Sequence, residues 1–173
     1  MTLLSKVEII GALQRLGELA QTQGLEVDLL AVGGVVMVLA YEARLATHDV
    51  DAIVMAPAEA RVVHDLANVV AQELGWPDEW LNDGAKGYLI GVSQGPVLLQ
   101  LPGITLRQPT AAQLLAMKLS AWRDDVDIAD ARHILEEMTG VQAAIWQQVE
   151  LYLVPGRELK ARYAFLDLWE SLY

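Results

Sequence analysis

The stretch from Ala31 to Met55, AVGGVVMVLAYEARLATHDVDAIVM, constrains the fold of this chain more than any other. Its pattern is typical of a strand end, a Gly-Gly turn, a helix, a second turn and a second strand. Side chains two residues apart on a strand point to the same face. Asp49 and Asp51 are therefore predicted to project together at the start of the second strand, whose following residues are apolar. The stretch predicts a strand–helix–strand unit with two carboxylates at one end.

Two neighbouring carboxylates repel each other, so the pair at Asp49 and Asp51 favours a bound cation. A divalent metal with oxygen ligands, Mg²⁺ or Mn²⁺, meets this requirement. Gly33 and Gly34 allow a ligand to approach the backbone closely, and the N–H groups that open the next helix favour an anion. A metal site beside a phosphate-binding turn indicates nucleotide chemistry.

The composition sets limits on the partners of this chain. It has 173 residues, 54% of them hydrophobic, which is enough for the core of one ordinary domain. Its 12 basic and 23 acidic residues give a net charge of −11, which disfavours nucleic-acid binding over the whole surface but not through one local basic patch. The charge suits a small anionic substrate screened by metal, or a basic protein partner. The absence of cysteine excludes disulfides, thiol catalysis and cysteine-based zinc sites.

The location of the protein is inferred from its apolar runs. None of them reaches the roughly 18–20 residues of a membrane span. The beginning, MTLLSKVE, lacks the basic-then-apolar pattern of a signal peptide. We therefore expect a cytoplasmic protein with no membrane partner.

Hydrophobic spacing predicts the secondary structure, with helices at 5–20, 34–43, 57–74, 110–123, 127–138, 141–154 and 157–172. Strands are expected at 27–32, 49–55, 88–92 and 97–101, with an edge strand at 104–106 and a hairpin joining 88–92 to 97–101. Pro57 suits a first helical turn, Gly75 a helix end and Thr110 an N-cap. These elements predict an α+β fold: a small mixed β-sheet of four or five strands flanked by helices, in residues 1–109. Residues 110–173 form a C-terminal helical portion, which we expect to pack on this core as one compact domain.

The order Gly33-Gly34, Arg44, Thr47, Asp49 and Asp51 resembles the nucleotidyltransferase superfamily of the DNA polymerase β type. Its AbiEii-like and minimal members, found in bacterial toxin–antitoxin and phage-defence systems, are the most similar. Two later stretches resemble the same group, WLNDGAKGYL at 80–89 and LLAMKLSAWRDDVDIADARHIL at 114–135. The resemblance implies a mixed sheet flanked by helices and a Mg²⁺-dependent transfer of NMP from an NTP. The acceptor would be a hydroxyl of RNA, such as tRNA, or of a protein, and a toxin or antitoxin partner is implied as well.

The resemblance also assigns roles to residues. Asp49 and Asp51 would bind the metal and would be catalytic together with Lys118. The residues that would contact the nucleotide are Gly33, Gly34, Arg44, Thr47, Lys86, Arg123 and Asp127. Arg44 has an alternative role, an ion pair with either carboxylate that holds the loop. Which acid among Asp124, Asp125, Asp127 and Asp130 matches the family signature is open.

One departure from the family pattern leaves two other functions open. Polymerase-type transferases carry a third carboxylate on a later strand, whereas Gly87 to Thr110 contains no Asp or Glu and its strand VLLQLPG offers only Gln100. A carboxamide cannot accept a proton as a carboxylate does. The chain would then be a catalytically degenerate protein of a two-protein system, binding nucleotide or a partner. A third alternative is a dimerising domain that uses Trp146 and Trp169.

Overall fold

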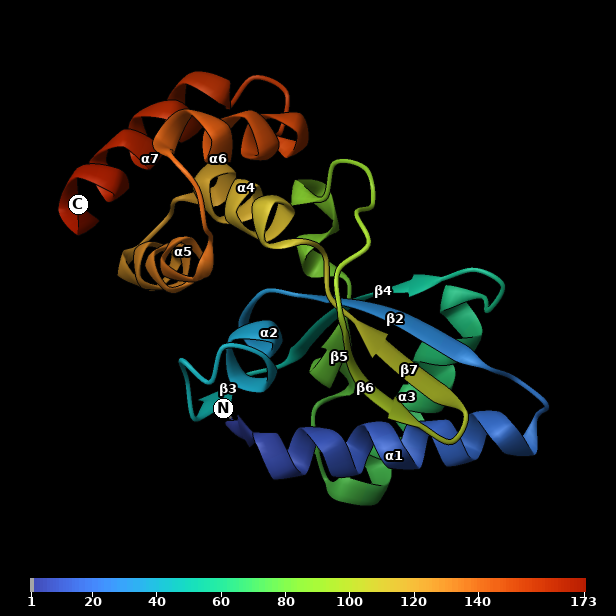
Figure 1. Ribbon diagram of the computed structural model, residues 1–173. Coiled ribbons are helices and arrows are strands. Elements are labelled where there is room, and N and C mark those ends of the chain that lie inside the picture. Colours follow the sequence, from blue (N-terminus) through green and yellow to red (C-terminus); the bar gives the residue numbers. More distant parts are fainter. Residues whose placement is uncertain (1) are drawn as a thin grey trace. The chain divides into compact units, whose positions relative to one another are not determined.

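The computed structural model describes residues 2–173 and confirms the α+β class (Figure 1). The chain forms two compact units, and each is described by itself. The first comprises the chain up to Ala85 together with Pro96–Gln108. The second comprises Lys86–Gly95 and Pro109–Tyr173. None of the helices in residues 2–173 is both long and apolar enough to cross a bilayer.

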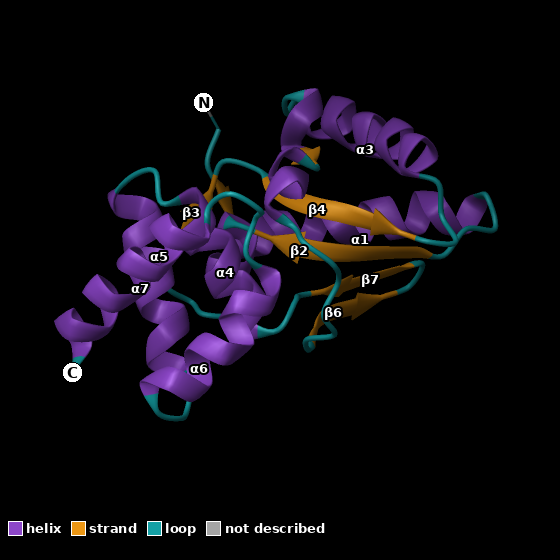
Figure 2. Cartoon of the chain, turned by 90° about the horizontal axis from the view of Figure 1, so that it is seen from above, coloured by secondary structure: helices purple, strands orange, loops and turns teal. Residues whose placement is uncertain are grey.

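The first unit is built on a five-stranded mixed sheet in the order β5-β4-β2-β7-β6 (Figure 2). Its strands are β2 (Val27–Val32), β4 (Val50–Met55), β5 (Leu81–Asn82), β6 (Val97–Leu101) and β7 (Ile104–Arg107). β2 runs antiparallel to β4 and parallel to β7, and β4 runs parallel to β5. A separate two-stranded ladder pairs β1 (Leu4–Ser5) with β3 (Ala46–Thr47). The expected strands at 27–32, 49–55 and 97–101 are thus present, the second beginning one residue later.

Two helices, α1 (Lys6–Thr22) and α3 (Ala60–Leu74), pack against each other and against the strands of this sheet (Figure 1). β2 is covered on both faces after Asp28, because residues 29–32 are each at most 3% exposed. α1 approaches the β6–β7 turn so closely that a Cβ at Gly17 would overlap the carbonyl oxygen of Pro102. Ser5 caps α1 in a capping box with Glu8.

Several predictions for the first unit are wrong. β7 lies between β2 and β6, so it is an interior strand and not an edge strand. The hairpin joins β6 to β7, because residues 88–92 contain no strand. α3 begins at Ala60, and Pro57 lies in a turn before it, after a cis peptide bond. The helix after the glycine pair, α2 (Gly34–Leu39), has six residues and ends well before Ala43.

The second unit contains four helices, α4 (Ala111–Ala121), α5 (Asp125–Glu137), α6 (Gln142–Val149) and α7 (Glu158–Leu172), with a short 3₁₀ turn η3 (Glu150–Tyr152). Thr110 is the N-cap of α4, as predicted, and its Oγ1 accepts a hydrogen bond from the Gln113 backbone N–H. Leu115, Leu119 and Phe165 are fully buried in the core. The helices of the C-terminal portion are therefore where the hydrophobic spacing predicts them, with ends shifted by at most five residues.

The segment between β5 and β6 is fixed in the second unit by one buried glutamine. Gln113 on α4 has no exposed surface. Its Oε1 accepts hydrogen bonds from the Ser93 backbone N–H, at 2.8 Å, and from the Ser93 hydroxyl, at 2.6 Å. Its Nε2 donates to the carbonyl oxygens of Ile90 and Gly91, both at 3.0 Å. The polar backbone of a strandless segment is thereby satisfied by a single side chain.

Candidate functional site

Asp49 and Asp51 both contact one short turn in the first unit. Asp49 directly precedes β4, and Asp51 is its second residue. The Asn82 Nδ2 donates to Asp49 Oδ2 at 2.9 Å. The backbone N–H of Ala85 donates to Asp51 Oδ1 at 3.2 Å. Asp49 and Asp51 therefore each accept a hydrogen bond from the Asn82–Ala85 segment.

The glycine pair forms a corner beside Asp51. Gly33 has φ +70° and ψ −145°, a conformation that a residue with a side chain rarely adopts. A Cβ at Gly33 would lie 3.4 Å from Asp51 Oδ2. Gly33 precedes α2, directly after β2, whose last residue Val32 is in register with Asp51. The corner and the second carboxylate thus face each other across neighbouring strands.

Arg44 and Thr47 approach the other glycine of the corner. A Cβ at Gly34 would lie 2.5 Å from Thr47 Oγ1 and 3.2 Å from Arg44 Nη1. Thr47 is buried, with 6% of its surface exposed. A guanidinium group and a hydroxyl therefore contact the backbone of the Gly-Gly turn, where both would reach a phosphate group bound there.

The donor set of Asp49 and Asp51 fits a hard divalent cation. Mg²⁺ is commonly held by one or two carboxylates, with water and substrate phosphates completing its octahedral shell. Each of the two acids uses one oxygen to accept a hydrogen bond from the Asn82–Ala85 turn, so the turn orients both carboxylates. Residues 2–173 contain no cluster of three or more His, Cys, Asp or Glu side chains that would form a larger metal cage. The residues present thus match Mg²⁺ or Mn²⁺ held together with a polyphosphate, rather than a metal enclosed by protein alone.

The short α2 changes the expected phosphate site. A long helix would present the positive end of its dipole at Gly34, but six residues form less than two turns. The positive charge of Arg44 and the backbone N–H groups of the glycine corner are left as the groups that suit an anion. A phosphate bound at this corner would therefore interact with Arg44 more than with the helix dipole.

Lys118 is the centre of an ion cluster in the second unit. Its Nζ lies 2.7 Å from Asp130 Oδ2 and 3.2 Å from Asp127 Oδ1. The side chains of Asp127 and Asp130 are 2% and 3% exposed. Arg123 donates to Asp127 Oδ2 from its backbone N–H at 3.0 Å and from Nε at 3.1 Å. A lysine on an apolar helix thus has the anionic partners that its burial requires.

Asp127 is the acid that contacts both Lys118 and Arg123, and the other candidates have different places. Asp124 is the N-cap of α5, accepting from the backbone N–H groups of Val126 and Asp127. Burial by itself raises the pKa of Asp127, but the hydrogen bonds from Arg123 and the charge of Lys118 outweigh burial and lower that pKa below its usual value. The same contact with Asp127 raises the pKa of Arg123. Asp127 is therefore a fixed anion that orders the two cations.

Near the end of α4, two arginine side chains lie beside the ring of Tyr88. The guanidinium carbons of Arg123 and Arg157 lie 5.9 and 5.5 Å from the centre of the Tyr88 ring. Arg157 donates to the carbonyl oxygen of Ser120, and Lys160 to that of Ala121, both at 2.9 Å. Within residues 2–173, neither Arg157 nor Lys160 forms an ion pair with a carboxylate. We call Tyr88, Arg123, Arg157 and Lys160 the basic cluster.

The predicted site residues therefore fall into two groups. The first unit brings together Gly33, Gly34, Arg44, Thr47, Asp49 and Asp51, and the second brings together Lys118, Arg123 and Asp127. Lys86 follows Ala85 directly and begins the second unit, in the 3₁₀ turn η2 (Gly84–Tyr88). His48, which lies between Thr47 and Asp49, is exposed.

Asn82 is a site residue that the sequence interpretation missed. It belongs to β5, a two-residue strand in a stretch predicted to be a loop. Trp80, which is 2% exposed, anchors this strand through a hydrogen bond from its Nε1 to the carbonyl oxygen of Ala67. A strand of two residues is too short for a period-two pattern, so the sequence contains no clear signal for it.

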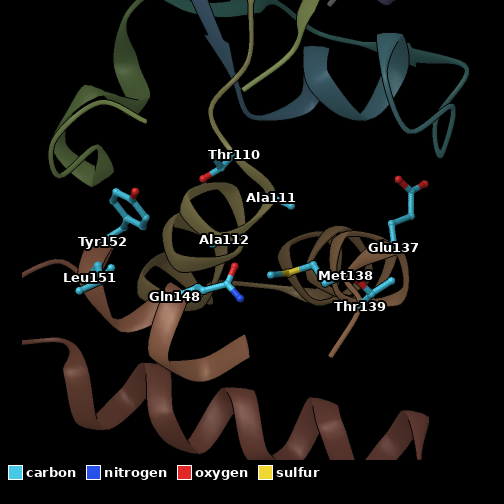
Figure 3. Close-up of a pocket in the computed structure, with 9 residues that line it drawn as sticks. All are labelled: Thr110, Ala111, Ala112, Glu137, Met138, Thr139, Gln148, Leu151 and Tyr152. Atoms are coloured by element: carbon cyan, nitrogen blue, oxygen red, sulfur yellow. The ribbon is translucent and has the colours of Figure 1, made fainter. Parts of the chain in front are cut away.

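The second unit also contains a cavity of about 410 Å³ (Figure 3). It lies between the start of α4 at Thr110–Ala112, the end of α5 and the segment from Gln148 to Tyr152. None of the predicted site residues lines it.

Comparisons with protein-family models, curated proteins and solved structures found no match to this chain.

Proposed function

We propose that this chain is a metal-dependent nucleotidyltransferase that moves NMP from an NTP onto a hydroxyl of RNA or protein. The observation that supports the proposal is the meeting of Asp49 and Asp51 with the Gly33-Gly34 corner in one unit. Carboxylates for a cation, backbone for a phosphate and a guanidinium group to neutralise charge are the groups that such a transfer needs. We place the reaction in the cytoplasm, as part of a bacterial toxin–antitoxin or phage-defence system.

In this proposal the protein contributes mainly position and charge. Arg44 neutralises a phosphate at the glycine corner, and the Asn82–Ala85 turn holds both carboxylates in one orientation. When bound at these carboxylates, Mg²⁺ supplies charge neutralisation for the triphosphate and the transition state. Phosphoryl transfer passes through a loose transition state in most analyses, so it relies on positioning and electrostatics more than on a general base. The lack of an acid between Gly87 and Thr110 is therefore compatible with turnover.

The basic cluster favours RNA as the acceptor. Arg and Lys groups around an aromatic ring bind single-stranded nucleic acid by neutralising phosphates while bases stack. Tyr88 has two guanidinium groups beside it, and Arg157 and Lys160 contact helix carbonyl oxygens rather than carboxylates. In a chain of net charge −11, such a cluster provides the local basic patch that RNA requires.

Label transfer tests the proposal. The protein is incubated with each α-labelled NTP, Mg²⁺ and total tRNA or cell lysate. We expect labelled RNA, and we expect Asp49→Asn and Asp51→Asn to lower the rate by about 100-fold or more, because each removes a metal-binding charge. Asp65→Asn, an exposed acid on α3, is the matched control and keeps the wild-type rate. No label transfer together with no NTP binding by calorimetry would contradict the proposal.

A second candidate is a catalytically degenerate protein that binds nucleotide or a partner chain in a two-protein system. The neutral carboxamide of Asn82 beside the two acids, and the lack of an acid between Gly87 and Thr110, favour it. NTP binding without turnover on any acceptor would support this candidate. Turnover that is lost in both aspartate variants would exclude it.

A further inference from the structure

Asn82 connects the two carboxylates of the candidate site. It lies on β5 in register with Asp51 on β4. Its Nδ2 donates to Asp49 Oδ2 at 2.9 Å and to the carbonyl oxygen of Glu79 at 3.1 Å. Its Oδ1 accepts from the Gly84 backbone N–H at 2.8 Å. Because those two oxygens only accept and the Gly84 N–H only donates, the orientation of the carboxamide is determined by its partners.

The same side chain also orders the contact to Asp51. The bond from Gly84 to Asn82 Oδ1 shapes the turn, and the next backbone N–H, that of Ala85, donates to Asp51 Oδ1 at 3.2 Å. A Cβ at Gly84 would lie 3.0 Å from Asn82 Oδ1, so the turn fits tightly around the carboxamide. Asn82 thus contacts Asp49 directly and acts on Asp51 through the turn.

We propose that Asn82 is a positioning residue of this site, which holds Asp49 directly and Asp51 through the Asn82–Ala85 turn. The inference rests on the proposed function, because it concerns the same metal and nucleotide. Asn82 adds no charge to the pair of acids, and its Nδ2 fixes Asp49 through one oxygen. The site therefore keeps two negative charges in a set orientation, which suits a cation that arrives with polyphosphate oxygens as further ligands.

Changing Asn82 to aspartate or alanine gives opposite effects on metal binding. In Asn82→Asp, a carboxylate faces Asp49 Oδ2 and the Glu79 carbonyl oxygen, so oxygens face one another without a proton between them. A cation relieves this repulsion, so the variant gains affinity for metal alone. In Asn82→Ala, the donor to Asp49 and the acceptor for Gly84 are lost, and metal affinity falls about tenfold or more, as for other residues that hold metal ligands.

The test is thermal unfolding of the full chain in EDTA and over a range of Mn²⁺ concentrations, with and without a non-hydrolysable NTP analogue. We expect Asn82→Asp to melt below the wild type in EDTA and to be stabilised at Mn²⁺ concentrations about tenfold lower than the wild type requires. Asn82→Ala should require about tenfold more Mn²⁺ than the wild type when the analogue is present. Asn68→Asp on α3 is the control, with the same chemical change outside the site, and keeps the wild-type Mn²⁺ dependence.

Equal Mn²⁺ dependence of the wild type, Asn82→Asp and Asn82→Ala would overturn the inference, because a merely structural residue changes the melting temperature but not the metal requirement. If Asn82→Asp does not fold, the Mn²⁺ dependence of Asn82→Ala alone tests the inference. A second readout for Asn82→Ala is the Mg²⁺ concentration that gives half-maximal NMP transfer, compared with the rate at saturating Mg²⁺. One outcome separates the two proposals: the wild type binds no NTP, but Asn82→Asp still binds Mn²⁺ more tightly than the wild type. This outcome would contradict the proposed function and would support the role of Asn82.

Discussion

Glycine at position 34 is required by space rather than by backbone angle. A Cβ there would lie 2.5 Å from Thr47 Oγ1, so Gly34→Ala must displace either the threonine or Arg44. We expect a loss of about 1–3 kcal/mol in the free energy of unfolding and weaker NTP binding. Urea unfolding and calorimetry with NTP measure both effects.

Gly11 provides the matched control for this substitution. It also lies in a helix, α1, but a Cβ there meets no atom within 4 Å. Gly11→Ala should therefore stabilise the protein by up to about 1 kcal/mol, from helix propensity alone, and leave NTP binding unchanged. Equal effects of the two substitutions would show that the Gly34 corner has no special packing.

Asp127 gives the molecule a stability that depends on pH. Its pKa is lowered in the folded state, so its contribution is complete above the unfolded pKa of about 3.9 and is lost as the pH falls through the lower folded value. We expect Asp127→Asn to cost about 3 kcal/mol at pH 7, because it breaks a buried ion cluster. The variant should also lose less stability than the wild type between pH 5 and pH 2.

Urea unfolding at a series of pH values measures this difference. The lowered pKa values of Glu73, held by hydrogen bonds to Arg15, and of Glu8, held by hydrogen bonds to Ser5, are retained in the variant and contribute to its remaining pH dependence. Identical pH dependence of Asp127→Asn and the wild type would refute the role of Asp127.

The sequence was sufficient to predict that Asp51 lies beside the Gly33 turn, because the strand–turn–helix–strand pattern is local. It was not sufficient for Asn82, whose partners Asp49 and Glu79 are brought together by the pairing of β5 with β4. Likewise, the sequence left open which of Asp124, Asp125, Asp127 and Asp130 matches the family signature, and only the structure shows that Asp127 and Asp130 contact Lys118 whereas Asp124 caps α5.

At the scale of elements, β2 could be predicted from local sequence whereas the end of α2 could not. β2 has the predicted bounds because its apolar residues follow one another in the chain and indicate a buried strand without reference to distant residues. α2 ends at Leu39, and three residues later Glu42 adopts φ +50° and its carboxylate pairs with Lys6 Nζ at 2.9 Å. A left-handed residue just after a helix is usually glycine, so a glutamate there gives no local signal.

The predicted strand at 88–92 failed for a related reason. Its apolar residues suggested a strand. Instead, the side chain of Gln113 forms hydrogen bonds with the carbonyl oxygens of Ile90 and Gly91 and with the N–H of Ser93, which are groups that would pair with a neighbouring strand in a sheet. A side chain on a helix that follows 20 residues later cannot be assigned to this role from spacing alone.

Gln113→Leu tests this role of α4. The substitution leaves a buried N–H and two carbonyl oxygens without partners, at about 1–3 kcal/mol for each unsatisfied group. We expect a destabilisation of at least about 2 kcal/mol and faster hydrogen exchange at the Ser93 amide. Gln147→Leu, on the exposed side of α6, should change stability by less than about 0.5 kcal/mol. Unchanged exchange at Ser93 in Gln113→Leu would contradict the assignment.

For the whole molecule, RNA binding depends on the difference between the negative net charge and the positive charge of the basic cluster. A chain of net charge −11 repels RNA in general, so any binding should depend on the basic cluster and on salt. We expect fluorescence anisotropy with labelled tRNA to show binding that weakens with salt. The double variant Arg157→Gln with Lys160→Gln should reduce the slope of log affinity against log salt by about 2.

Arg132→Gln is the control for charge, because Arg132 lies on α5 in the same unit and bonds to Ser171 Oγ. Its slope should stay close to that of the wild type. A double variant with the slope of the Arg132→Gln control would remove the basic cluster from the acceptor site and favour a protein acceptor.

The most direct test of the central claim is a crystal structure with a non-hydrolysable NTP analogue and Mn²⁺, in which anomalous scattering locates the cation. We predict a Mn²⁺ peak coordinated by Asp49 and Asp51, with the triphosphate against the Gly33-Gly34 backbone and Arg44. A bound analogue with its triphosphate elsewhere, or with no Mn²⁺ at either aspartate, would contradict the claim.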